Sequence, residues 1–126
     1  MNIKELKEKA DKEAKENAQK ALEDCRNAIV YNIKNKMKTN VFKKKVIKFY
    51  TNSYCDLKDL ANPELLKEPL DIKLVDEYLF KADRIFLLSL DNNYYKLEEK
   101  PVFQEMNHIT ITEIDEETAK KLLIDN

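Results

Sequence analysis

The sequence contains no glycine and no tryptophan, and only three prolines and one histidine in 126 residues. The missing glycine excludes every phosphate-binding loop that depends on it, including the P-loop and the dinucleotide-binding fingerprint. It also predicts that any backbone position with positive φ is occupied by Asn or Asp, the residues that tolerate this region best after glycine.

Few residues are suited to catalysis. His108 is the only histidine, and no serine or cysteine nucleophile motif accompanies it. Cys25 and Cys55 lie thirty residues apart and form no C-x-x-C pattern, so the sequence predicts two free thiols packed as small apolar groups. A zinc site would need further histidines or cysteines. The sequence therefore predicts no enzyme, no cofactor and no metal site.

No apolar run approaches the roughly 20 residues that a membrane span needs, and the N-terminus lacks the apolar core of a secretory signal. We therefore expect a single domain over residues 1–126, located in the cytoplasm and not in a membrane.

Lysine outnumbers arginine 21 to 2, and asparagine occurs twelve times. Because the codons of Lys and Asn are AT-rich, this composition indicates an AT-rich genome, such as that of a low-GC bacterium or of one of its phages or mobile elements. The location would then be the host cytoplasm.

The first 37 residues are expected to form one long helix. Small or apolar residues recur about every 3.7 positions from Ile3 to Met37, and no proline interrupts them. At 1.5 Å per residue such a helix reaches on the order of 50 Å, which exceeds the diameter of the domain, so the helix is expected either to project at one end or to bend. The first 20 or so residues are therefore either a projecting arm or a solvated helix held weakly against the domain. Its alanines (Ala10, Ala14 and Ala18) are a candidate contact surface for a partner or a second copy.

The C-terminal half predicts an α+β fold. Strands are expected at 84–90 and 94–98 around an Asn92-Asn93 turn, and at 108–114, with helices at 71–82 and 116–124. Residues 38–70 form a basic connector in which 40–54 favour a helix slightly over a strand. The predicted fold is a long N-terminal helix and a small three-stranded antiparallel sheet packed by two helices. Its expected core residues are Leu22, Ile29, Ile33, Leu74, Tyr78, Ile85, Leu87, Ile109, Ile111, Leu122 and Leu123.

The charge of the chain is segmented. Residues 25–55 hold eight basic residues and no acid, whereas residues 56–126 hold nine basic residues and seventeen acids. Lysines interleaved with aromatic residues are typical of surfaces that bind single-stranded nucleic acid, although the same stretch could face the acidic half of the chain or an acidic protein. The candidate nucleic-acid-binding residues are Lys34, Lys36, Lys38, Lys43, Lys44, Lys45 and Lys48.

Four acids close to the C-terminus, Glu113, Asp115, Glu116 and Glu117, favour the N-terminus of a helix and are weaker candidates for partner binding. The leading functional hypothesis is a non-enzymatic protein-binding module, such as a phage inhibitor of a host defence nuclease, which the chain resembles in composition only. A nucleic-acid-binding protein and a homo-oligomer built through the N-terminal helix are the two alternatives.

Overall fold

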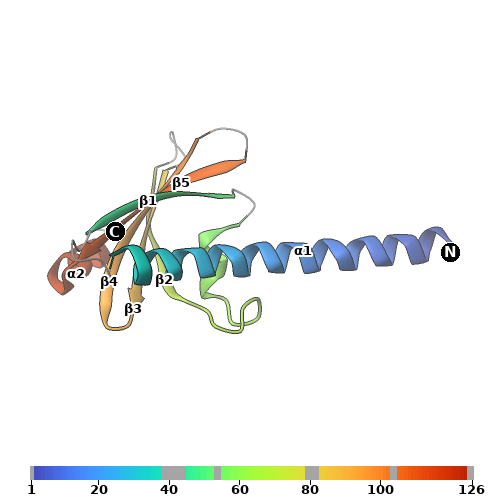
Figure 1. Ribbon diagram of the computed structural model, residues 1–126, viewed down its shortest axis with the longest axis horizontal. Coiled ribbons are helices and arrows are strands. Elements are labelled where there is room, and N and C mark those ends of the chain that lie inside the picture. The colour runs from blue at the N-terminus through green and yellow to red at the C-terminus, as the bar shows by residue number, and fades with distance from the viewer. Residues whose placement is uncertain (1, 38–44, 53–54, 79–82, 103–104, 125–126) are drawn as a thin grey trace.

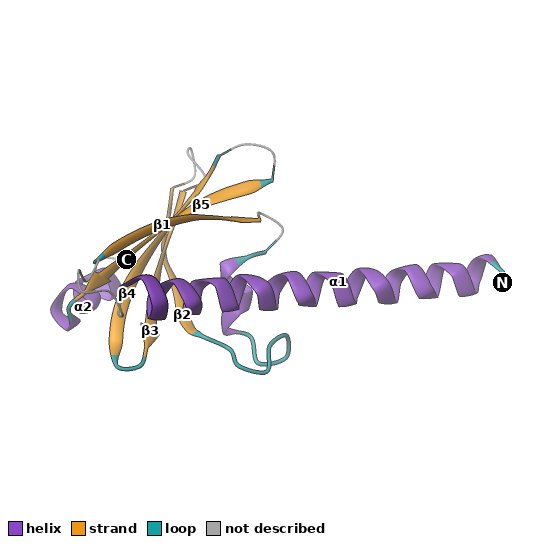
Figure 2. Ribbon diagram, viewed as in Figure 1, coloured by secondary structure: helices purple, strands orange, loops and turns teal. Residues whose placement is uncertain are grey.

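The computed structural model describes residues 2–37, 45–52, 55–78, 83–102 and 105–124. They form one antiparallel sheet with a long helix on one face and a short helix on the other (Figures 1 and 2). The elements are α1 (Ile3–Asn32), a π-helical turn (Ile33–Met37), β1 (Val46–Asn52), a 3₁₀ helix (Leu57–Ala61), β2 (Asp71–Tyr78), β3 (Asp83–Leu90), β4 (Asn93–Pro101), β5 (Met106–Ile114) and α2 (Glu116–Ile124).

The sheet has five strands, in the order β1-β5-β4-β3-β2, and not the three that the sequence predicted. Strands β2 to β5 follow one another as a meander. β1 joins the far edge by pairing with β5, with Ile47 opposite Ile111 and Phe49 opposite Ile109. The two strands that the prediction lacked, β1 and β2, are therefore the two edges of the sheet.

The helix expected at 71–82 is wrong, because residues 71–78 form β2, while 79–82 lie outside the described residues. The cause is that both faces of the sheet are covered at this strand: Leu74 packs against the core under α1, and its neighbour Val75 is buried in the core under α2. Apolar residues therefore occupy adjacent positions, which imitates the spacing of a helix rather than the alternation of a strand with one buried face. The pairing with β3 is also irregular between Leu74 and Asp76.

The slight preference for helix at 40–54 is also wrong over 46–52, where the chain forms β1. Residues 40–44, 53 and 54 lie outside the described residues. Ile47 is buried and Phe49 half-buried on the face under α1, whereas Val46, Lys48 and Tyr50 are exposed. This is the alternation of a half-buried strand, and it agrees with the β propensity of these residues.

The predicted long helix is confirmed from Ile3 onward. The side chain of Asn2 caps it by accepting a hydrogen bond of 2.8 Å from the backbone N–H of Glu5. Only the C-terminal part packs on the sheet, through residues between Leu22 and Met37. Most of the predicted core is buried or half-buried, but Tyr78 and Leu123 are exposed by 49% and 46% and were wrongly assigned to it.

The predicted hairpin and C-terminal helix are present. The two turn residues between β3 and β4 are Asp91 and Asn92, one position earlier than expected, with φ of 50° and 66°. Asp115 caps α2 by accepting a hydrogen bond of 2.8 Å from the N–H of Thr118. The expectation that positive φ falls only on Asn or Asp is wrong at Glu105, whose φ is 66°.

Candidate functional site

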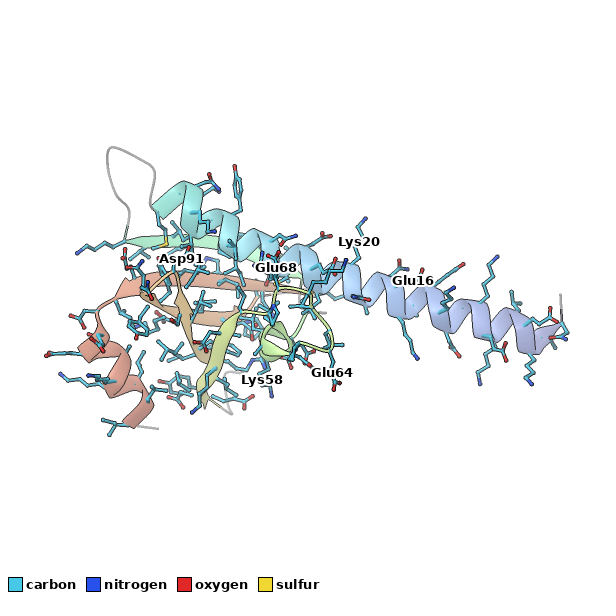
Figure 3. The ribbon with its side chains drawn as sticks, turned by 90° about the horizontal axis from the view of Figure 1, so that it is seen from below. Glu16, Lys20, Lys58, Glu64, Glu68 and Asp91 are labelled. Atoms are coloured by element: carbon cyan, nitrogen blue, oxygen red, sulfur yellow. The ribbon has the colours of Figure 1, made fainter. Side chains whose placement is uncertain are left out.

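The N-terminal part of α1 projects from the domain as an arm, defined as residues 2–20 (Figure 1). Every residue of the arm is exposed, and its helical part, from residue 3 to 20, spans about 27 Å at the rise of an α-helix. Figure 3 shows its side chains, Glu16 among them, extending into solvent around the helix. Two large apolar residues lie at the tip: Ile3 is 87% exposed and Leu6 is 58% exposed.

The base of the arm borders a cavity of about 500 Å³ between α1 and the segment 55–65. Its wall is mainly apolar, with Ala18 and Leu22 from α1 and Leu65 from the facing loop. The cavity is lined by Lys15, Ala18, Gln19, Leu22, Cys55, Asp56, Asp59 and Leu65. This cavity has no local signal in the sequence, because it forms only where distant segments meet.

Two side chains of α1 fix the loop that faces the cavity. Arg26 donates a hydrogen bond of 2.9 Å from Nε to the carbonyl oxygen of Glu68 and pairs with the Glu68 carboxylate at 3.2 Å. Gln19 donates a longer bond of 3.4 Å to the carbonyl oxygen of Leu65. These bonds connect the loop that contains Leu65 and Glu68 to α1.

A buried ion cluster lies under α1. The Arg84 guanidinium donates to Glu99 Oε1 at 2.7 Å and to Asp56 Oδ1 at 3.1 Å, and its central carbon lies 5.1 Å from the centroid of the Phe86 ring. Burial alone would lower the pKa of Arg84, but the hydrogen bond and charge of Glu99, followed by those of Asp56, outweigh it and raise that pKa. Only 4% of the Glu99 side chain is exposed. The cluster therefore ties β3 and β4 to the segment that borders the cavity.

Both cysteines are buried next to this cluster, as free thiols. Burial raises the pKa of Cys25 to about 12, and the charges of Cys55 and Glu99 act in the same direction. Burial also raises the pKa of Cys55, whose Sγ donates a hydrogen bond of 3.1 Å to the carbonyl oxygen of Ala21. Thiols with raised pKa values stay protonated at neutral pH and are poor nucleophiles.

The structure distributes the candidate lysines over different surfaces. Lys34 and Lys36 lie on the π-helical turn after α1, and Lys34 pairs with Asp91 at 3.7 Å. Lys48 lies on β1 and is exposed on the opposite face of the sheet from α1, as the alternation with buried Ile47 requires. Lys45 immediately precedes β1. The remaining candidates, Lys38, Lys43 and Lys44, lie outside the described residues.

One part of the sheet face opposite α1 combines aromatic and basic side chains, and we call it the open face. Tyr50 on β1 is 62% exposed, and its ring centroid lies 5.2 Å from that of His108 on β5. In the register of the sheet, Lys100 on β4 is the neighbour of His108, and Thr110 is the neighbour of Lys48. The sequence could not reveal this grouping, because it depends on the pairing of β1 with β5.

Some of the four acids close to the C-terminus make contacts within the fold. Asp115 is the helix cap described above, and hydrogen bonding to the side chain of Thr118, followed by that to its backbone N–H, lowers the pKa of Asp115. Glu116 pairs with Lys120 at 3.7 Å on the surface of α2. Glu117 lies exposed in the first turn of α2, where negative charge is favourable. Glu113 is half-buried at the end of β5, and its N–H donates a 2.8 Å bond to the carbonyl oxygen of Lys45.

Within the described ranges, no helix is long and apolar enough to cross a membrane, and no group of three or more His, Cys, Asp or Glu side chains is placed to hold a metal ion. His108 lies on the face of the sheet opposite the two thiols, because it is half-buried beside Tyr50 while Cys25 packs in the core under α1. The sheet therefore separates the histidine from the cysteines, its candidate catalytic partners.

Comparison with known proteins gives no relative for this chain. No protein-family model, no curated protein and no solved structure matches it. The arm, the cavity and the open face must therefore be interpreted from their own geometry and chemistry.

Proposed function

We propose that this chain is a non-enzymatic protein-binding module and that the arm is its binding element. The observation that carries the proposal is the complete exposure of residues 2–20, including Ile3 and Leu6 at the tip. Scattered apolar side chains are common on protein surfaces. Ile3 and Leu6 lie at the end of a helix that extends away from the core, where neither side chain is buried.

The arm is suited to recognition because it is preformed. Ala, Lys, Glu and Leu are strong helix formers, and the packed part of α1 supplies the helical nucleus that an isolated peptide would have to form at a cost. A partner that docks on the arm therefore loses little free energy in ordering it. Helices that present apolar residues three and four positions apart are a recurring mode of protein recognition.

Catalysis is not supported by the groups that could carry it. The thiols are buried with raised pKa values, and the sheet separates them from His108. The arm, rather than the acidic C-terminal segment, is the surface we assign to the partner, since Asp115 and Glu116 are engaged within α2.

We retain a regulator or inhibitor from a phage or mobile element as the biological setting, on the basis of the Lys-rich, Asn-rich composition. The base composition of the coding DNA and its neighbouring genes would test this.

The proposal is tested by affinity capture with the full chain and two double variants. I3S/L6S removes the apolar tip, and E8S/K12S makes two equally exposed substitutions on the opposite side of the arm. We expect a protein retained in stoichiometric amount by the wild type and by E8S/K12S from a low-GC bacterial lysate, and lost with I3S/L6S. Equal capture by all three chains, or by none, would contradict the proposal.

A second candidate function has support from the open face. Single-stranded nucleic acids bind surfaces where basic side chains track the phosphates and an aromatic ring stacks on a base. Tyr50 with His108 supplies the ring, and Lys48 and Lys100 supply positive charge, although Glu98 lies on the same face and pairs with Lys96 at 3.4 Å. The shortage of arginine disfavours base-specific contacts.

This candidate is tested by fluorescence anisotropy with short single-stranded DNA and RNA at two salt concentrations. Y50A should weaken binding, whereas Y31A, which removes a similarly exposed tyrosine from α1, should not. Binding that is indifferent to Y50A, or that does not weaken as salt is raised, would exclude the open face as the site.

A further inference from the structure

We infer that Cys25 and Cys55 form a redox-modification site, at which a small disulfide oxidant converts the two thiols reversibly into a bond that ties α1 to the segment that begins at Cys55. These are the only two cysteines of the sequence, and they are thirty residues apart along it. The fold brings both into one core cluster as free thiols on two different segments. The inference does not depend on which partner the arm binds.

One hydrogen-bond acceptor places the two side chains together. The carbonyl oxygen of Ala21 accepts the 3.1 Å bond from Cys55 Sγ. In an α-helix the same oxygen accepts the backbone N–H of the residue four positions later, here Cys25, over about 3 Å. The Cα–Cβ bond of a helical residue tilts toward the N-terminus, so the Cys25 side chain leans toward the turn that holds Cys55 Sγ. A side-chain hydrogen bond also joins the two thiols. The two sulfur atoms are therefore neighbours, as a disulfide requires.

Two cavities give a small oxidant access to the pair. Cys55 lines the cavity of about 500 Å³ at the base of the arm. Both cysteines line a second cavity, of about 270 Å³, between α1 and β1. The wall of this second cavity includes Asp24, which is exposed, so the cavity reaches the surface. Because Cys55 borders both cavities, we expect its thiol to react first and that of Cys25 to complete the bond.

The chemistry is thiol–disulfide exchange in two steps. The Cys55 thiolate attacks one sulfur of the oxidant and forms a mixed disulfide, and the other half of the oxidant leaves as a thiolate that takes up the proton lost by Cys55. The Cys25 thiolate then attacks Cys55 Sγ, and the second half leaves with the proton lost by Cys25. The protein thiols lose two electrons and two protons, and the oxidant becomes two thiols. The product carries no charge, which suits a core position near the Glu99 carboxylate.

The bond acts as a clamp at the base of the arm. In the reduced chain, Cys55 contacts α1 through a thiol hydrogen bond, and thiols are weak donors. In the oxidised chain the same contact is covalent. The cavity at the base of the arm lies between the two segments that the bond joins. The redox state therefore controls whether α1 can separate from the wall of this cavity.

The first test treats the folded full chain with excess oxidised glutathione. Because burial raises the pKa of both thiols, the reaction is run at about pH 8.5, where more thiolate is present. The remaining thiols are alkylated after denaturation and counted by mass spectrometry. We expect the wild type to lose both alkylatable thiols, to give a peptide that links Cys25 to Cys55, and to recover both thiols with dithiothreitol. The control C25A should stop at a mixed disulfide on Cys55. A wild type that keeps both thiols, stops at the mixed disulfide or links two chains would overturn the inference.

The second test asks whether the bond belongs to the native fold. Closing a loop of about thirty residues restricts the unfolded chain, so the melting temperature of the oxidised chain should exceed that of the reduced chain by about 10 °C. Amide hydrogen exchange of α1 around Cys25 should become slower on oxidation, whereas that of the outer arm should be the same in both states. An oxidised chain that melts at or below the temperature of the reduced chain would mean that the bond distorts the fold, and this result would refute the native clamp.

Discussion

Replacing Arg84 tests the physical account of the buried cluster. The side chain of Arg84 is 15% exposed and that of Glu99 is 4% exposed, with 2.7 Å between Nε and Oε1. The second oxygen of this carboxylate, Oε2, is buried and has no hydrogen-bond partner among the described residues. Arg84 is therefore the group that compensates the charge of Glu99 in this part of the core.

The variant R84M keeps an apolar stem but removes the guanidinium, and with it both the charge and the contact to the Phe86 ring. Breaking a buried pair by removing one partner costs about 3–5 kcal/mol, because the remaining charge is left without compensation. The total stability of a domain is about 5–15 kcal/mol, so this loss is a large fraction of it. Asp56 contributes less to the loss, because its side chain is 42% exposed and stays hydrated.

Urea unfolding of a double-mutant cycle measures the effect. In E99L alone, Arg84 keeps its bond to Asp56. The double variant R84M/E99L replaces the pair with apolar groups, so its free energy of unfolding should recover to within about 1–2 kcal/mol of the wild type. Arg26, the other arginine, is the matched control: its partner carboxylate on Glu68 is 78% exposed, and R26M should cost only about 1 kcal/mol. If R84M cost no more than R26M, the reasoning that Glu99 depends on Arg84 would be refuted.

Three further predictions concern single positions. Because burial raises the pKa of Cys25 from 9.0 to about 12, the folded chain keeps this thiol protonated where the unfolded chain ionises it. The contribution of the Cys25 thiol to stability is complete below pH 9 and is lost as the pH rises toward 12. The free energy of unfolding should therefore fall relative to that of C25A by roughly 1.4 kcal/mol per pH unit above pH 9. Parallel pH profiles of the two proteins would contradict this. Glu105 has a φ of 66°, so E105G should raise the free energy of unfolding by about 0.5–1 kcal/mol, whereas E105A, which keeps a Cβ, should not. Leu97 is fully buried in β4, so L97A should lower the free energy of unfolding in urea by about 2–5 kcal/mol, and a loss below 1 kcal/mol would mean that the core closes over the gap.

Elements with local signals could be predicted from the sequence. The interval Ile3–Met37 contains the whole of α1 and its π-helical turn, because helical spacing continues without proline across it. The helix 116–124 was predicted from the cap at Asp115, and the β3–β4 hairpin from the Asn92-Asn93 pair, although its turn lies one position earlier. In each case the residues that determine the structure lie within one or two turns of one another.

Elements that depend on distant partners could not be predicted in the same way. β1 pairs with a strand about sixty residues away, so its own ambiguous pattern was the only local evidence. β2 is covered on both faces, so the adjacent residues Leu74 and Val75 pack against different cores and imitate the spacing of a helix. The same limit applies to function: the projecting arm follows from helix length, but the cavity and the Tyr50–His108 contact require segments that only the fold brings together.

The segment that begins at Cys55 links the buried cluster to the base of the arm. This segment lines the cavity, and two contacts hold it in place: the ion pair of Asp56 with Arg84, and the hydrogen bond from Cys55 to the carbonyl oxygen of Ala21 on α1. Loss of the Arg84 cluster should therefore alter the cavity before it alters the arm, which makes no contact with the cluster in its outer turns. A substitution in the outer arm such as I3S/L6S should instead weaken capture of a partner by the arm without any loss of stability in the domain. The two kinds of variant thus separate the role of the cavity from that of the arm.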